Sequence, residues 1–187
     1  MTSILSRRAF AAAALAALPL LAACGNGIGS RGAEDIDGRV DATLNYMYSE
    51  FPATRGLAQK SSAMLVMPVI TEVGLGLGGG YGRGALRVGD VSLDYYSATA
   101  ANVGLQIGAQ QYAHVLFFMT DDALEQFRRS RGWALGADVE YVFNNQGETL
   151  RAESTTGMSP IVAIVFGQAG AKIGASLEGV KYNRIIP

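Results

Sequence analysis

A run of glycines in the middle of the chain places the strongest constraint on its fold. From residue 74 to residue 84, glycine occupies at least every second position. Because successive side chains of a β-strand point to opposite faces, such a run leaves one strand face bare, so another layer can approach it or the sheet can bend. Strings within the run also fit the GxGxxG phosphate loop, but that loop requires a following helix. Residues 85–95 instead predict a strand, a turn at Gly89-Asp90 and another strand, so we interpret the run as structural.

Three helices are expected outside this run. Apolar residues recur every three or four positions over residues 40–51, which is typical of an amphipathic helix with Asp37 as its N-cap. Its outer face carries acids, so we interpret its apolar stripe as packing against a core rather than on a membrane surface. A short second helix is expected over residues 53–60. Thr120 is predicted to cap a third helix over residues 121–131, whose acidic first turn and basic last turn complement the helix dipole.

The rest of the chain predicts strands. Its 24 glycines, about twice the usual share, indicate a fold rich in strands and turns. Residues 62–70 are expected to form a buried strand that ends in a bend at Pro68. Two more strands fit residues 91–119, with Gly104 and Gly108 as bulges. The later elements are a strand over 133–143, a turn over 144–147, a strand over 148–154 and a hairpin of 161–166 with 171–177.

The first 23 residues predict an export signal rather than part of the folded domain. Arg7 and Arg8 precede an uncharged run over residues 9–23 that is too short to cross about 30 Å of hydrocarbon as a helix. The order of charged, apolar and small residues is that of a secretory signal. Residues 6–10 are similar to a twin-arginine signal, which exports folded proteins, and general secretion is the alternative.

The end of this signal predicts the attachment of a lipid. Residues 21–24 resemble a bacterial lipobox, in which the sulfur of Cys24 takes a diacylglycerol before cleavage. Acyl chains anchor a protein stably because each buried methylene contributes about 0.8 kcal/mol. A signal for retention in the inner membrane would place an aspartate directly after the lipidated cysteine. This chain has Gly25 at that position, so we expect an outer-membrane lipoprotein that faces the periplasm. Residues 24–34 then form a flexible tether and residues 35–187 a single folded domain.

Composition and charge exclude several classes of function. With one cysteine and one histidine, the chain offers neither an internal disulfide nor a histidine-based metal cluster. Lys plus Arg number 15 against 16 for Asp plus Glu, so no basic field indicates nucleic-acid binding. His114 lies in a run typical of a packed strand, and the chain has no G-x-S-x-G elbow. We therefore expect a protein that is not an enzyme, with no catalytic residues, no metal and no cofactor.

Five motifs in series resemble one known domain family. They lie at residues 63–68, 73–84, 104–110, 115–124 and 176–179. Their order is similar to that of the SYLF domain, and the resemblance covers most of residues 39–184. It implies an α+β fold with a curved, mostly antiparallel β-sheet that is half-barrel-like, an N-terminal amphipathic helix and one helix near 121–131. It also implies a non-enzymatic domain that binds membrane lipid, either phosphoinositides or other anionic phospholipids.

Two hypotheses about function remain. In the first, the folded domain binds lipid headgroups through cations near the glycine run. The candidate contacts are Lys60, Arg83 and Arg87. In the second, the domain is an envelope scaffold that binds a protein or peptidoglycan, and Cys24 is its one contact with lipid. A sheet edge or exposed aromatic residues would then form the working surface. The aromatic candidates are Tyr95, Tyr96 and Tyr112.

Overall fold

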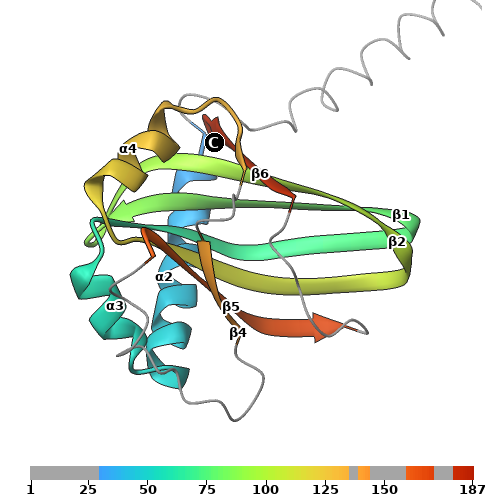
Figure 1. Cartoon of the computed structure of the whole chain (residues 1–187), viewed down its shortest axis with the longest axis horizontal. Coiled ribbons are helices and arrows are strands. Elements are labelled where there is room, and N and C mark those ends of the chain that lie inside the picture. Colours follow the sequence, from blue (N-terminus) through green and yellow to red (C-terminus); the bar gives the residue numbers. More distant parts are fainter. Residues whose placement is uncertain (1–29, 135–138, 144–158, 171–178) are drawn as a thin grey trace, which may run out of the picture.

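The computed structural model describes residues 30–134, 139–143, 159–170 and 179–187. Its elements, in chain order, are α2 (Gly32–Glu50), α3 (Thr54–Lys60), β1 (Ala63–Val88), β2 (Val91–Phe118), α4 (Asp121–Arg129), β3 (Trp133–Ala134), β4 (Val139–Phe143), β5 (Ile161–Gly170) and β6 (Val180–Ile185). Within this part of the chain, six strands form one curled sheet beside three helices (Figure 1). The expected α+β fold with a mostly antiparallel, half-barrel-like sheet is therefore confirmed.

The sheet is built around one very long β-hairpin. β1 and β2 pair antiparallel from Val88 opposite Val91 at the turn to Ala63 opposite Phe118 at the far ends. The hairpin folds back on itself near its middle, so its two halves lie in two layers (Figure 1). β6 pairs with residues 95–100 of β2 in one layer, and β5 pairs with residues 110–118 in the other. β4 extends the second layer by pairing with β5 in parallel.

The glycine run lets the two halves of β1 pass close to each other. A Cβ atom on Gly84 would lie 2.0 Å from the carbonyl oxygen of Val66, and one on Gly82 would lie 2.4 Å from that of Val69. Both distances are far shorter than the contact distance of nonbonded heavy atoms, so a side chain does not fit at either position. The predicted bare strand face is confirmed, and the layer that approaches it is the first half of the same strand.

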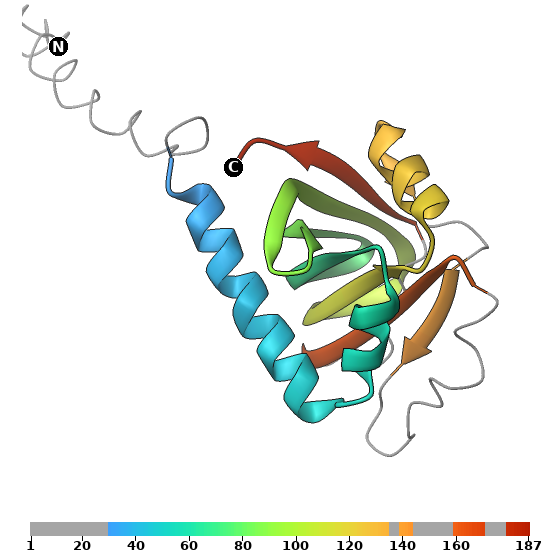
Figure 2. The same ribbon diagram turned by 90° about the vertical axis from the view of Figure 1, so that its left-hand side faces the viewer.

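Two apolar cores lie on opposite faces of the strands nearest α2. From the start of β1, Leu65 and Met67 point into the curled sheet, where Phe127 of α4 joins them. The alternate residues Met64 and Val66 point outward into a second core beneath α2 and α3. The stripe that α2 buries there consists of Ile36, Val40, Leu44 and Met47. Figure 2 shows α2 along one side of the sheet and α4 on another. The amphipathic helix thus packs against a core, as expected.

Two expected strand boundaries inside the hairpin are wrong, because bulges absorb irregularities that could equally have ended a strand. β1 continues through a register shift at Pro68 instead of ending there. Residues 91–118 form one strand rather than two. Gly104 lies in a second shifted stretch of the ladder, and Gly108 adopts a φ of 147°, which favours glycine. A bulge disturbs the ladder locally and leaves the pairing on either side intact.

The helix termini agree with the sequence at α4 and differ at α2. The backbone N–H of Ala123 donates to Oγ1 of Thr120 at 3.2 Å, which confirms the predicted cap, although α4 ends at Arg129. α2 begins at Gly32, within the expected tether, and has no side-chain cap. The hydroxyl of Ser30 donates to the carbonyl oxygen of Pro187 at 2.9 Å, which ties the start of α2 to the C-terminal residue. The N-cap assigned to Asp37 is therefore wrong.

The strand expected over residues 133–143 is divided between two places in the sheet. β3 pairs with β6, whereas β4 pairs with β5 at the other end of the strand order. Alternation of apolar and polar residues predicts extended backbone, but it carries no information about which neighbour a strand joins. The predictions for the signal over residues 1–23, for Cys24 and for residues 144–154 and 171–177 lie outside the described residues.

Candidate functional site

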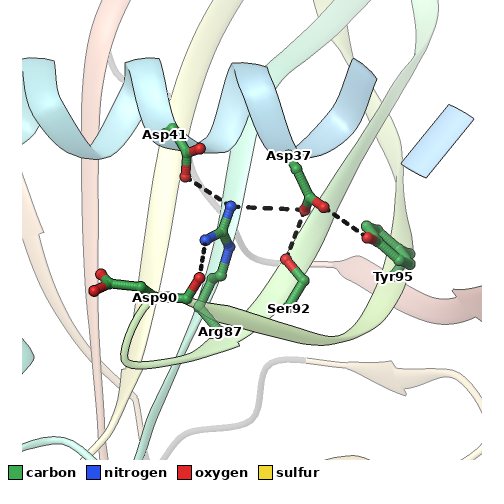
Figure 3. A network of polar contacts seen from close by, with 6 residues as sticks. All are labelled: Asp37, Asp41, Arg87, Asp90, Ser92 and Tyr95. Carbon is green, nitrogen blue, oxygen red and sulfur yellow. Dashed lines mark hydrogen bonds and ion pairs between the residues drawn. The ribbon is translucent and has the colours of Figure 1, made fainter. Parts of the chain in front are cut away.

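An arginine–aspartate network joins α2 to the turn of the β1–β2 hairpin (Figure 3). The side chain of Arg87 is buried near the end of β1, and its Nη2 lies 2.7 Å from Oδ1 of Asp41 and 3.6 Å from Oδ1 of Asp37. Its Nη1 donates to the carbonyl oxygen of Asp90 at 2.6 Å. The charge of Arg87 is thus neutralised within the protein, and a contact with an external headgroup would require this network to break.

Asp37 extends the same network to β2. Its Oδ1 accepts a hydrogen bond from the hydroxyl of Ser92 at 2.6 Å, and its Oδ2 accepts one from the hydroxyl of Tyr95 at 2.8 Å. Burial raises the pKa of Tyr95, and the hydrogen bond to Asp37 raises it further. Asp37 therefore fixes the position of α2 against the hairpin through its side chain, which explains why an acid is placed within the helix rather than at its cap.

A cavity with two cations lies at the surface between α2 and β1. The cavity has a volume of about 190 Å³, and its lining includes Asp35 and Arg39 from α2 and Tyr81 and Arg83 from β1. Arg39 is exposed and Arg83 is partly buried. The charged side chains among these lining residues are two arginines and one aspartate, whereas the whole chain has a net charge of −1. The planar fork of arginine donors matches the oxygens of phosphate and carboxylate groups.

A second, predominantly apolar cavity adjoins the first along α2. Its volume is about 300 Å³, and it shares Pro68 and Val69 of β1 with the cationic cavity. α2 contributes Ala42 and Tyr46 to its lining, and β5 contributes Phe166. The rings of Tyr46 and Phe166 stack with their centroids 6.1 Å apart. The two cavities adjoin each other at Pro68 and Val69, and we call this pair of cavities, with its charged end and its apolar end, the α2–β1 groove.

Buried polar side chains also occur inside the curled sheet. Glu72 is buried there, and its two carboxylate oxygens accept hydrogen bonds from Nε2 of Gln110 at 2.6 Å and from the hydroxyl of Tyr112 at 2.8 Å. His114 is fully buried, with its Nε2 2.7 Å from the hydroxyl of Tyr182. The expectation that His114 lies in a packed strand is confirmed, because it is a fully buried residue of β2.

The structure separates the three cations predicted to contact a headgroup. Arg83 lines the cationic cavity, whereas Arg87 is buried in the network described above. Lys60 is exposed at the end of α3 and lines neither cavity of the groove. Arg39 was missed by sequence reasoning, since the helical pattern alone does not show which strand lies beside a given face of α2.

Most of the aromatic surface expected for a scaffold is enclosed in the fold, and Tyr95 is left partly exposed. Tyr96 and Tyr112 are buried in the core of the curled sheet, and the hydroxyl of Tyr95 is bonded to Asp37. Their alternation with small and polar residues indicated a strand but not which face the curl would enclose. The exposed tyrosines at the α2–β1 groove are instead Tyr46 and Tyr81, with 49% and 54% of their surfaces accessible.

The described residues contain neither a candidate metal site nor a helix that could span a membrane. In this part of the chain no group of three His, Cys, Asp or Glu side chains is placed to hold a metal ion. The helices described here also lack a segment that combines the length and the apolar character needed to cross a bilayer.

The fold and the groove define a class of protein, an α+β domain in which a curled antiparallel sheet carries an amphipathic helix beside a groove with cationic and apolar ends. Residues 99–184 match the family model described as Ysc84, Las17-binding protein actin regulator. The predicted resemblance to the SYLF domain is confirmed over these residues, which run from β2 through α4 to β6. α2 and β1, which hold Arg39 and Arg83, lie outside the matched range. A search of the curated proteins gave no match.

Proposed function

We propose that this protein is a membrane-anchored, non-enzymatic lipid-binding protein whose folded domain binds the headgroup of an anionic phospholipid. The observation that carries the proposal is the convergence of Arg39 from α2 and Arg83 from β1 on one surface cavity. Guanidinium groups are the preferred protein partners of phosphate. The family match supports a lipid-binding or actin-related domain. We favour lipid, because the lipoprotein signal expected over residues 1–24 would take the domain out of a bacterial cytoplasm and anchor it to a membrane.

The proposed anchor would hold this cavity close to a membrane. A diacylglycerol on Cys24 would be joined to Ser30 by a chain that spans at most roughly 20 Å. Ser30 is fixed beside Pro187 at the start of α2, and Arg39 lies about two turns further along that helix. Figure 2 shows that the start of α2 and the C-terminus lie at the same end of the domain. We propose that this end faces the periplasmic surface of the outer membrane.

A local cationic site is needed, because the overall charge of the chain does not favour anionic membranes. Removal of residues 1–23 with Arg7 and Arg8 would change the net charge from −1 to −3. A lysine or arginine near an anionic surface contributes about 1 kcal/mol to binding. Loss of both Arg39 and Arg83 should therefore weaken binding by about 2 kcal/mol, which corresponds to roughly 30-fold.

Vesicle flotation tests this proposal. The mature chain from residue 24 is used with Cys24→Ser, so that an attached lipid does not contribute to flotation. We expect flotation with vesicles that contain phosphatidylglycerol, weaker flotation at higher salt, and none with phosphatidylcholine alone. Arg39→Gln combined with Arg83→Gln should reduce the bound fraction as calculated above.

The matched control removes the same charge from another face of the domain. Arg129 on α4 and Arg131 after it are both exposed, so the double variant Arg129→Gln with Arg131→Gln should bind as the parent does. Equal losses in the two double variants would show a nonspecific charge effect, and no flotation of the parent would remove the proposal.

The scaffold hypothesis is the second candidate, and the end of the hairpin favours it. Val88, Val91 and Leu93 flank the turn and expose 41%, 63% and 44% of their surfaces. Exposed apolar side chains that cluster mark contact sites for proteins. Under this hypothesis Val91→Asp abolishes crosslinking to an envelope partner, whereas the variants at Arg39 and Arg83 leave it unchanged.

A further inference from the structure

The proposed headgroup site uses the charged end of the α2–β1 groove and leaves its apolar end without an assigned ligand. The apolar cavity of about 300 Å³ adjoins the cationic cavity, since Pro68 and Val69 line both. Beyond that point the lining is formed mainly by carbon atoms of Ala42, Tyr46 and Phe166. A ligand that contacts both ends must therefore carry an anionic group and an apolar chain in the same molecule.

Apolar side chains remain exposed along this groove. Tyr46 exposes 49% of its surface, Val69 41% and Tyr81 54%, and each of them lines one or both cavities. Isolated apolar residues on a surface are common, whereas three that line two adjoining cavities form a patch of the kind that binding sites use. Their burial by an alkyl chain would remove apolar surface from water on both the ligand and the protein.

We propose that the α2–β1 groove binds a single-chain anionic lipid, a lysophospholipid, with its phosphate at Arg39 and Arg83 and its acyl chain in the apolar cavity. This inference rests on the proposed function and names the ligand class for the same site. The size of the apolar cavity favours one chain over two, because 300 Å³ lies at the lower limit of small-molecule sites, about 300–1,000 Å³.

The α2–β1 groove runs along α2, with its charged end nearer the start of the helix. The cationic cavity lies beside the early turns of α2 at Asp35 and Arg39, and the apolar cavity lies beside its later turns at Ala42 and Tyr46. Arg39 and Tyr46 are about 10 Å apart along the helix axis. A chain bound in this way points away from the end of the domain that carries the tether.

The apolar end is tested by titration calorimetry with alkyl phosphates, through the dependence of their affinity on chain length. The mature chain with Cys24→Ser is titrated with methyl, butyl, octyl and dodecyl phosphate, each below its micelle concentration. Affinity should rise with every added methylene, by up to about fourfold each, until the cavity is filled. Methyl phosphate reports the cationic end alone, because it has no chain to place in the cavity.

Two variants obstruct the apolar cavity, and one control leaves it open. Ala42→Phe fills the cavity from an exposed position on α2, and Val69→Glu places a carboxylate at the junction of the two cavities. Both should remove the dependence on chain length. Asn45→Phe adds the same ring at an exposed position of α2 that lines neither cavity, and should bind as the parent does. Thermal melts of all variants show whether the fold is kept. If one obstructing variant fails to fold, the other still tests the inference.

Several outcomes would overturn the inference. Affinities that do not change from methyl to dodecyl phosphate exclude the chain site, as does unchanged binding by both obstructing variants. Stronger binding of dioctanoyl phosphatidylglycerol than of a single-chain lipid would show that two chains are accepted. If the lipidated protein fails to bind dodecyl phosphate while the Cys24→Ser chain binds it, the occupant is the protein's own anchor. Flotation with anionic vesicles alongside a flat chain-length series rejects this inference and keeps the proposed function, whereas loss of flotation rejects the proposed function itself.

Discussion

Replacement of His114 by glutamine should remove a large part of the acid sensitivity of this fold. His114 is fully buried between the rings of Tyr112 and Tyr182, with ring centroids 6.0 and 5.8 Å away. Its Nε2 is bonded to the Tyr182 hydroxyl, and its Nδ1 has no hydrogen-bond partner among the described residues. Burial lowers the pKa of His114 to about 3, because the imidazolium would lose its hydration.

The pKa of His114 differs between the folded and the unfolded chain, and this difference sets the sign and size of the change in stability with pH. In the unfolded chain His114 takes a proton near pH 6.5, whereas in the fold it stays neutral down to about pH 3. Its contribution to stability is therefore fully present above pH 6.5 and is lost as the pH falls toward 3. Between pH 7 and pH 5 this loss amounts to about 2 kcal/mol, since each pH unit below the unfolded pKa costs about 1.4 kcal/mol.

Urea denaturation at pH 7, 6 and 5 and constant ionic strength measures this contribution. The parent should lose about 2 kcal/mol more of its unfolding free energy across this range than His114→Gln, whatever their absolute stabilities. Carboxylates also begin to titrate toward pH 5, but they do so in both proteins, so their contribution cancels when the two pH profiles are subtracted. Parallel pH profiles for the two proteins would refute the reasoning, because they would show that His114 takes up its proton without unfolding.

Two other predictions concern stability. Gly84→Ala should destabilise the fold by about 3 kcal/mol or more, because its Cβ would lie 2.0 Å from the backbone oxygen of Val66. The control Gly38→Ala, on the exposed side of α2 with no atom within 4 Å of the new Cβ, should stabilise it by about 0.5–1 kcal/mol in urea titrations. Arg87→Met should cost about 1–3 kcal/mol and speed hydrogen exchange in α2, since it leaves Asp37 and Asp41 without their cation. Vesicle binding by the folded variant should be unchanged, and a loss of binding would restore Arg87 as a headgroup contact.

Local patterns in the sequence determined most of the individual elements. The apolar stripe of α2, the Thr120 cap of α4 and the Gly89-Asp90 turn each depend on residues within about four positions of one another. The bare glycine face of β1 could also be predicted from a local pattern, because residues two positions apart lie on the same face of a strand. The burial of His114 followed from the apolar run around it.

The candidate site depended on the tertiary structure. Arg87 and Asp41 are 46 positions apart, so a buried structural cation could not be told from an exposed ligand by sequence pattern alone. Arg39 and Arg83 meet because β1 folds back on itself and brings its second half beside α2, which is a property of the whole hairpin. The division of residues 133–143 between two sheet positions is of the same kind.

The physical reason is the range of the interactions involved. Helix periodicity, capping and strand pleat are set by the backbone geometry of neighbouring residues, so the sequence alone determined them. Which strand joins which, and which charges meet, is decided by the packing of distant segments against one another. Here that packing requires glycine at positions 82 and 84, where the two halves of β1 pass each other too closely for a side chain. The α2–β1 groove exists because the folded strand then lies against α2.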